Sequence, residues 1–421
     1  MAPMAELVGA RAKRSRRRFL RTHPWIDFCS PVGALQPTFW LHVGAAESKC
    51  VHIARSPLKP ELAEKLHQTS ITKGARATTA IEGNTLTEEQ VARAVRGELE
   101  VPPSQEYLKR EASNVIDAFN ELTRRLIGER EPLVLTPGLL EALNGKILEG
   151  AELAEGVVAG SIRTHSAVVG GYRGAPAEDC RFLVELLCDW INGDELRPPG
   201  DEDDPVATFY CAFLRATLAH LYLAWIHPFG DGNGRLSRLV EFAILIEAGV
   251  PLTAAHLLSH HYNLTRSRYY TRLEVSSQAG RGMAGVTRFL DYAVEGFADQ
   301  LAEQILEISR AVFATTWREY VYDTLPAGTP AQRRQRKVTL ELPSHLSPRE
   351  GWVRRADIRT LTPEIAELYA SKGPRTVARD VNRLFEQGVV IGDAGRIAAN
   401  SALLLRHMPS ARDFDHSPMI V

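Results

Sequence analysis

The segment from His227 to Arg238 combines residue types that suit phosphate chemistry. Gly232 and Gly234 let backbone N–H groups turn inward at the start of an apolar helix, an arrangement that binds phosphate. Asp231 offers a hard oxygen ligand for Mg²⁺ on phosphates. His227 titrates near neutrality and is placed to take a proton from an incoming hydroxyl. The pattern therefore indicates a phosphate-binding loop with a base at one end.

Two arginines lie on the helix that follows this loop. Arg235 and Arg238 are three residues apart, so they share one helical face and can fork onto phosphate oxygens. Each feature alone has an ordinary structural explanation: a histidine before a proline, a glycine turn, a solvated arginine pair. Their concentration within twelve residues favours a functional loop.

This segment resembles the signature of the Fic (Fido) family, His-x-Phe-x-Asp/Glu-Gly-Asn-Gly-Arg-x-x-Arg, and meets every fixed position. The resemblance covers about residues 70–300. Thr265 departs from the pattern, because the family usually has Asn there. Further matching positions are Ala219-His220, Ser259, Arg266 and Tyr269-Tyr270.

Proteins of this family typically transfer AMP from ATP to a hydroxyl of a target protein. The resemblance implies that His227 is the general base on a Ser, Thr or Tyr hydroxyl, that Asp231 holds Mg²⁺, and that Phe229 anchors the loop. ATP and a target protein are the implied partners. The implied nucleotide-binding residues are Gly230, Asp231, Gly232, Asn233, Gly234, Arg235, Arg238 and Tyr270.

The segment Thr78 to Asn84 resembles the inhibitory motif of the family, Ser/Thr-x-x-x-Glu-Gly/Asn. A helix that presents Glu82 to Arg238 would form an ion pair and keep that arginine from the γ-phosphate. Thr78 and Glu82 are therefore the expected inhibitory residues. The same carboxylate could instead orient a water molecule and make the enzyme remove AMP, and the sequence leaves both directions open.

Residues 157–172 interrupt the helical pattern with valines and a Gly170-Gly171 pair, which indicates a hairpin. This hairpin resembles the flap with which the family holds its targets by main-chain pairing. The expected docking residues are Ile162, Arg163 and Thr164. A purely structural hairpin is the alternative.

The sequence predicts a mainly α fold: a Fic-type helical bundle with a small β-hairpin flap, followed by a C-terminal winged helix-turn-helix domain. Within the Fic domain, an inhibitory helix is expected at about 71–83, the flap at about 157–172 and the loop at 227–238. The expected parts are a lead-in at 1–68, the Fic domain at 69–325, a linker at 326–340, the winged-helix domain at 341–407 and a tail at 408–421.

Apolar and amphipathic periodicity sets the expected elements. The first 65 residues are expected to be irregular. Strands are expected near 157–172, at 389–391 and at 402–405. Helices are expected at 60–67, 71–81, 87–96, 107–127, 136–147, 178–192, 206–225, 233–247, 262–277, 286–325, 353–361 and 371–387.

The C-terminal segment contains an amphipathic helix with a basic face. Arg375, Arg379 and Arg383 recur every four residues, opposite an apolar side. This face could bind DNA phosphates or dock a protein, and both readings stay open. A nucleotide-sensing, DNA-binding regulator is accordingly an alternative to the enzyme.

Composition excludes several classes of protein. Apolar residues make up 44% and charged residues 24%, and the net charge is −1, so the chain is neither disordered nor a polyelectrolyte. Five scattered cysteines without C-x-x-C fit a reducing, cytoplasmic location. We expect no membrane partner. Because members of the family often dimerise, a homodimer is a further expectation.

Overall fold

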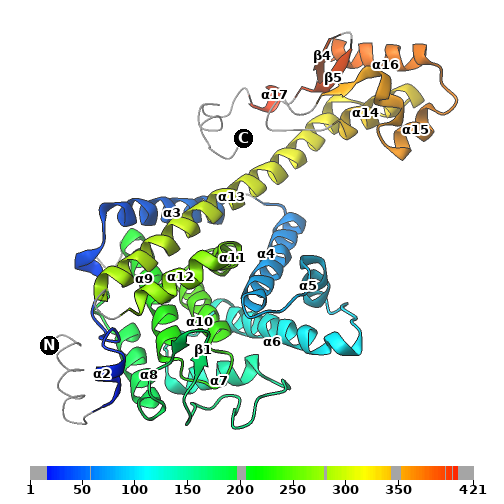
Figure 1. Cartoon of the computed structure of the whole chain (residues 1–421). Helices are drawn as coiled ribbons and strands as arrows, with labels where there is room; N and C mark the ends of the chain where they lie inside the picture. The colour runs from blue at the N-terminus through cyan, green and yellow to red at the C-terminus, as the bar shows by residue number, and fades with distance from the viewer. Residues whose placement is uncertain are drawn as a thin grey trace. The chain divides into compact units, whose positions relative to one another are not determined.

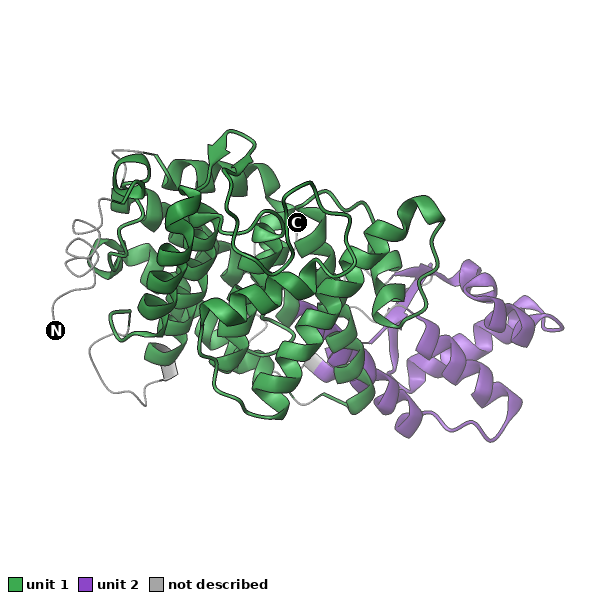
Figure 2. Ribbon diagram, turned by 90° about the horizontal axis from the view of Figure 1, so that it is seen from below, with its two compact units in different colours: residues 1–305 green, residues 306–421 purple. Residues whose placement is uncertain are grey.

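The computed structural model describes residues 17–56, 58–196, 205–278, 282–342, 352–393, 395–400 and 402–405. The chain divides into two compact units, residues 1–305 and 306–421 (Figure 2). Helices dominate both units (Figure 1), as the sequence predicts. The boundary falls within helix α13, Gly282–Thr324. The predicted tail at 408–421 lies outside the described residues.

The first unit is built from helices that follow one another with short connections. A 3₁₀ turn covers Val32–Ala34 and another Pro103–Gln105, and a π turn, Arg124–Gly128, extends α6. The helices before α13 are α2 Phe19–Thr22, α3 Pro37–Arg55, α4 Pro60–Ala80, α5 Glu88–Val95, α6 Glu106–Thr123, α7 Pro137–Ile147, α8 Ala177–Asn192, α9 Pro205–Ile226, α10 Asn233–Glu247, α11 Leu257–Leu264 and α12 Arg266–Ser276.

Helices α9 and α10 pack on each other at the centre of this unit. Every α10 residue from Leu236 to Ile246 is buried, so the helix is held on all sides. The stretch Ala207–Ile226 of α9 is, among the described helices, long and apolar enough to cross a membrane, but 83% of its apolar window is buried inside the structure. The candidate loop connects these two helices and is thereby fixed at both ends.

Three predictions about the helices of this unit are wrong. The lead-in contains the 19-residue helix α3, whose Phe39, Val43 and Ala46 form a buried stripe. Helix α4 is continuous where a break was predicted at 68–70, and within it the hydroxyls of Ser70 and Thr72 donate hydrogen bonds to carbonyls one turn back. Conversely, the helix predicted at 262–277 is divided between α11 and α12.

A short hairpin follows α7. Strands β1, Val168–Val169, and β2, Tyr172–Arg173, pair antiparallel, with Val169 opposite Tyr172 and Val168 opposite Arg173. Gly170 and Gly171 form the two-residue turn, as expected for such loops. The hairpin therefore occupies only the end of the predicted 157–172 segment.

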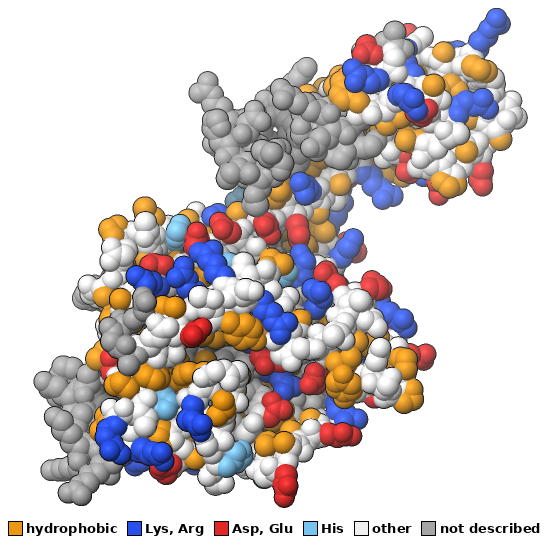
Figure 3. Space-filling model, in the orientation of Figure 1, with side chains coloured by type: hydrophobic (Ala, Val, Ile, Leu, Met, Phe, Trp, Pro, Cys, Tyr) orange, Lys and Arg blue, Asp and Glu red, His pale blue; other side chains and the backbone are white. Residues whose placement is uncertain are grey.

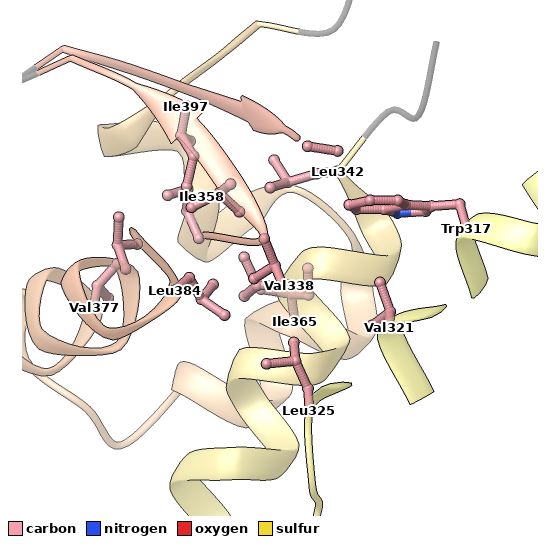
Figure 4. Packing of buried hydrophobic residues seen from close by; sticks show 14 of the residues in the cluster. Trp317, Val321, Leu325, Val338, Leu342, Ile358, Ile365, Val377, Leu384 and Ile397 are labelled. Atoms are coloured by element: carbon pink, nitrogen blue, oxygen red, sulfur yellow. The ribbon is translucent and has the colours of Figure 1, made fainter. Parts of the chain in front are cut away.

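The second unit has helices α14 Pro330–Glu341, α15 Pro363–Tyr369, α16 Pro374–Glu386 and α17 Ala402–Leu405, and a 3₁₀ turn at Arg355–Thr360. Its strands β3 Val353–Arg354, β4 Val390–Gly392 and β5 Arg396–Ala399 form an antiparallel sheet in the order β3-β5-β4. Apolar residues from α13, α14, α15, α16 and the strands form one core (Figure 4).

The structure corrects the predictions for this unit. The segment predicted as a linker, 326–340, contains α14, which Thr329 and Gln332 begin with a capping box. Residues 353–361 form a strand and a 3₁₀ turn instead of a helix, α15 is an additional helix, and 402–405 is helical instead of extended. The unit begins within α13, about 35 residues before the predicted start at 341.

Candidate functional site

A cavity of about 750 Å³ lies beside the candidate loop. Its wall contains Glu82 after α4, the turn of the hairpin, His227 at the end of α9, and Gly234 and Arg238 on α10. Helix α12 contributes Tyr269 and Tyr270. The cavity thus brings together the predicted base and one predicted phosphate-binding arginine, both from the segment 227–238, and the predicted inhibitory carboxylate from a distant part of the chain.

The loop is fixed by its own side chains. Asn233 bonds both the backbone N–H and the carbonyl of Phe229, at 3.0 and 2.9 Å, and the Phe229 ring is fully buried. Gly232 caps α10 with φ 78°, a conformation that favours glycine. Gly230 lies against the side chain of Val157. Asn233, Gly232 and Gly230 therefore shape the loop behind the cavity wall.

His227 has φ 50°, an uncommon conformation for a residue with a side chain. Burial and then the positive charge of Arg163 lower the pKa of His227 to about 4, although Glu82 raises it. His227 is consequently neutral near pH 7 and can accept a proton.

Arg163, one of the predicted docking residues, is buried. Its guanidinium donates to the carbonyls of His227 at 2.7 Å, His165 at 2.6 Å and Ala175 at 2.5 Å, and to that of Ile226 at 3.3 Å. Arg163 therefore joins the backbone at the start of the loop to the backbone on both sides of the hairpin.

The two other predicted docking residues lie on either side of Arg163. Ile162 forms an isolated antiparallel bridge with Phe229, next to the loop. Thr164 is exposed. The exposed valines of β1, Val168 and Val169, are 53% and 52% accessible and were not predicted as docking residues.

Asp231 in the loop and Arg235 on α10 form an ion pair in which only the carboxylate is exposed. The Asp231 side chain, 53% exposed, accepts from Gly232 N at 2.5 Å and from Arg235 at 3.2 Å. Arg235 is buried and also contacts Glu111 at 3.4 Å. The Nε atoms of Arg235 and Arg238 are buried donors for which the described part of the chain supplies no acceptor.

Arg238 binds the predicted inhibitory segment directly. Its guanidinium donates to Glu82 Oε1 at 2.5 Å and to the Thr78 carbonyl at 3.0 Å. Burial acts to raise the pKa of Glu82, but Arg238 outweighs this and the pKa is lowered. A Cβ at Gly234 would overlap Glu82 Oε1, so only glycine allows this approach. Glu82 is therefore ionised and in contact with α10.

Helix α12 contacts the segment that follows α4, the predicted inhibitory segment, through hydrogen bonds that the sequence did not indicate. Arg266 and the Tyr270 hydroxyl both donate to the Ile81 carbonyl, at 2.5 and 3.1 Å. Tyr270, predicted to bind nucleotide, lines the cavity and contacts the inhibitory segment as well. We call Arg266, Tyr270 and the Ile81 carbonyl the latch. Its partners are about 185 positions apart, so no local motif reveals it.

A buried hydrogen-bond chain supports the cavity wall from behind. The His220 ring contacts Glu241 at 3.3 Å and the Tyr269 hydroxyl at 2.9 Å, and Tyr262 donates to Glu241 at 2.9 Å. All four side chains are buried. This network fixes Tyr269 against the cavity and explains the two positions, His220 and Tyr269, that matched the family pattern.

His23, in the N-terminal segment, contacts the hairpin, and the sequence did not predict this contact. His23 contacts the Arg173 carbonyl of β2 at 2.8 Å, and its ring meets that of Tyr172 edge-on. Tyr172 in turn donates to the Trp225 carbonyl at 2.8 Å. The β2 side of the hairpin is thus covered, while the β1 valines stay exposed.

Comparisons with known proteins agree with this geometry. Residues 134–245 match the model of the Fic/DOC family. Two curated relatives named protein adenylyltransferase fic-1 are 27% identical in Caenorhabditis briggsae and 28% identical in Caenorhabditis elegans. These alignments cover 52% and 48% of this chain, and 41% and 35% of the relatives. The chain thus spans less than half the length of these relatives.

Solved structures show the same fold. A Fic family protein from Desulfovibrio desulfuricans has a TM-score of 0.50 at 17% identity, over 87% of this chain and 97% of that one. A Fic domain-containing signaling protein from Bacteroides thetaiotaomicron also has a TM-score of 0.50, at 21% identity, over 62% of this chain and 94% of that one. The family match over residues 134–245 and the shared fold make this chain similar to Fic family proteins.

Proposed function

We propose that the first unit transfers AMP from ATP to a Ser, Thr or Tyr hydroxyl of a target protein, and that Glu82 inhibits this transfer. The observation that carries the proposal is the contact between Glu82 and Arg238 in a cavity that His227 also lines. The curated relatives, which are named protein adenylyltransferases, support the same activity.

In the proposed reaction, the target hydroxyl oxygen bonds to the α-phosphorus of ATP. The bond from that phosphorus to the bridging oxygen breaks, and pyrophosphate leaves. His227 takes the hydroxyl proton. Its lowered pKa keeps it neutral at pH 7, so an unprotonated ring nitrogen can accept this proton.

The phosphates are proposed to bind at the start of α10. Gly234 lines the cavity there, and the buried Nε donors of Arg235 and Arg238 require acceptors. Phosphate oxygens are suitable acceptors, because guanidinium groups bind them through charge-assisted hydrogen bonds. Arg238 would serve the γ-phosphate only after Glu82 leaves it.

Asp231 fits the part of an Mg²⁺ ligand. It is an exposed carboxylate beside the loop, and the described residues contain no cluster of three or more metal-binding side chains. Mg²⁺ commonly binds one or two carboxylates, substrate phosphates and waters, so a single carboxylate suffices. The ion would neutralise charge on the phosphates; Asp231 would hold it, and Arg235 would keep Asp231 in place.

The proposed inhibition rests on the position of the Glu82 carboxylate beside Arg238. Glu82 occupies the guanidinium that the γ-phosphate needs, and its own negative charge repels the triphosphate. The latch keeps Glu82 at this place by fixing the preceding carbonyl. ATP bound against this carboxylate would have its α-phosphate displaced from the hydroxyl, and a displacement of about 1 Å can cost on the order of 10²-fold in rate.

AMP removal is a second candidate for the same site. Glu82 and His227 line one cavity, and the charge of Glu82 affects the pKa of His227. A carboxylate so placed could orient a water molecule toward an AMP ester. Release of AMP from a modified protein by the wild type, and its loss in Glu82→Gly, would favour this direction.

The experiment uses self-modification in a Glu82→Gly background. Intact mass after incubation with Mg²⁺ and ATP should show added AMP, and His227→Ala in that background should reduce it by about 10²- to 10⁴-fold. ATP affinity, measured by calorimetry, should stay nearly unchanged. His165→Ala, an exposed histidine near the hairpin, is the matched control. Equal loss of ATP binding and transfer would contradict the base role.

A further inference from the structure

The second unit carries a basic surface that the proposed transfer does not use. We propose that α16 and the β3–β5 strand pair bind double-stranded DNA, with α16 in the major groove and the strands on the adjacent backbone. The protein would then act while attached to nucleic acid. This inference is independent of the proposed transfer activity.

The element order supports this assignment. A four-residue connection, 370–373, which ends with Gly373, joins α15 to α16. Both helices pack on α14, and the β4–β5 hairpin follows α16. Two helices joined by a short turn that contains glycine are the arrangement in which the second helix enters the major groove of DNA.

Helix α16 is amphipathic in a way that leaves its arginines outside. Val377 and Leu384 point into the core of the unit (Figure 4). Arg375, Arg379 and Arg383 are exposed and lie one turn apart along the 13-residue helix. Among the described residues, Arg375 and Arg379 have no ion-pair partner, and Arg383 contacts only the exposed Glu386, at 2.7 Å.

The outer face of α16 is unlike a protein-docking surface. Protein interfaces are centred on buried aromatic and aliphatic anchors, and none of the large exposed apolar side chains lies on this helix. Its other exposed positions are Pro374, Ala378, Asn382 and Glu386. A row of arginines with small and amide side chains between them is suited to phosphates and base edges.

An independent observation comes from the sheet. Arg354 of β3 lies directly opposite Arg396 of β5 in the antiparallel register. Like charges in this position repel, so the pairing is unfavourable unless an anion compensates it. Arg354 contacts the exposed Asp357 at 2.7 Å, and Arg396 stacks over Trp352. Both guanidinium groups therefore stay near the surface, where a phosphate could neutralise them.

The sheet and the helix lie next to each other. The guanidinium of Arg355, which follows β3, is 4.7 Å from the centre of the Phe385 ring on α16. Residues 306–421 carry 17 Lys and Arg against 13 Asp and Glu, whereas the whole chain has 50 against 51. Figure 3 shows basic side chains spread over the visible face of this unit. Positive charge is thus concentrated in the second unit.

Not every basic residue of this unit takes part. The run Arg333–Lys337, predicted as a basic linker, belongs to α14, and its Arg334 is buried against Asp380 at 2.8 Å. The expected number of phosphate contacts is therefore about five, from three arginines of α16 and two of the strands. Neutralising about five phosphates predicts a slope of about −4.5 in log K against log salt.

The test is fluorescence anisotropy of full-length protein with a labelled 30-base-pair DNA duplex, without nucleotide. We expect binding that weakens by about 10²- to 10³-fold between 50 and 200 mM salt. Arg375→Ala/Arg379→Ala/Arg383→Ala should lower the slope by about three. The triple lysine variant should retain most of the slope, since phosphate contacts tolerate either cation.

The matched control is Arg310→Ala/Arg318→Ala/Arg333→Ala, which removes three exposed arginines of the same unit from α13 and α14. It should bind almost as the wild type does. Equal weakening by the two triple variants, a flat salt dependence or no binding would overturn the proposal. Equal affinity for duplex RNA of the same sequence would overturn the groove assignment, since the A-form major groove does not admit a helix.

Discussion

Arg238 with Glu82 in the first unit and Arg334 with Asp380 in the second are both pairs of a buried arginine with a carboxylate, and the two pairs are built differently. In the second unit, Arg334 and Asp380 are both nearly inaccessible, with side chains 6% and 2% exposed. Asp380 accepts from Arg334 at 2.8 Å and also from Tyr369 at 3.1 Å and Gln335 at 3.4 Å. This carboxylate is enclosed and fully bonded.

The pair in the first unit is open on one side. Arg238 is 1% exposed, but Glu82 is 36% exposed and lines the cavity. Among the described residues, the guanidinium of Arg238 is the one side chain that bonds Glu82, and the Nε of Arg238 has no acceptor. The comparison teaches that a buried arginine does not by itself show that an ion pair serves only to stabilise the fold. A carboxylate that faces a cavity can be replaced by another anion.

The largest expected effect is on the free energy of unfolding, which should fall much more when the enclosed pair is broken than when the open pair is broken. Asp380→Asn leaves Arg334 buried without its counter-charge, which should cost about 3–5 kcal/mol of unfolding free energy. Glu82→Gln should cost about 1 kcal/mol or less, because water in the cavity can solvate Arg238. Differential scanning calorimetry of the full chain measures both. A similar cost for the two variants would break the distinction between an enclosed and an open pair.

A smaller effect is expected at the latch. Tyr270→Phe keeps the ring in the cavity wall but removes the hydrogen bond to the Ile81 carbonyl. One hydrogen bond contributes about 0.5–1.5 kcal/mol, so self-modification should rise by about 2- to 10-fold. Tyr107→Phe, on an exposed tyrosine of α6, is the control. A rise in the control, or none in Tyr270→Phe, would remove the latch from the account.

The smallest expected effect is electrostatic. His227 should titrate with a midpoint about 4, and Glu82→Gly should lower this midpoint, because the Glu82 carboxylate raises the pKa of His227. Nitrogen-15 NMR of labelled histidines measures the titration. An unchanged or raised midpoint for His227 would show that the two groups do not interact across the cavity.

The candidate site was largely predictable because its information is local. The loop His227–Arg238 lies on consecutive residues, and α10 begins at Asn233 as predicted. The segment with Glu82 is a second short motif at a helix end. Proximity between Glu82 and Arg238 followed from combining two motifs, and the structure shows the contact.

The features that were predicted wrongly, or were not predicted, depend on contacts between residues far apart in the sequence or on a helix cap. Arg163 holds four carbonyls that lie up to 64 positions away, and nothing in its neighbours indicates burial. The latch and the contact of His23 with the hairpin are equally non-local. By contrast, the capping box of Thr329 and Gln332 is a local sequence signal. The run of basic residues that follows it indicated a linker, and the helix was therefore not predicted.

The most direct test of the central claim is the incorporation of α-phosphate-labelled ATP into the protein itself. Wild type, Glu82→Gly and Glu82→Gly/Arg238→Ala are incubated with Mg²⁺ under identical conditions. We predict that Glu82→Gly gains label about 10²-fold over wild type, and that the additional loss of Arg238 returns incorporation to near the wild-type level. Equal labelling of wild type and Glu82→Gly would contradict inhibition through the Glu82–Arg238 pair.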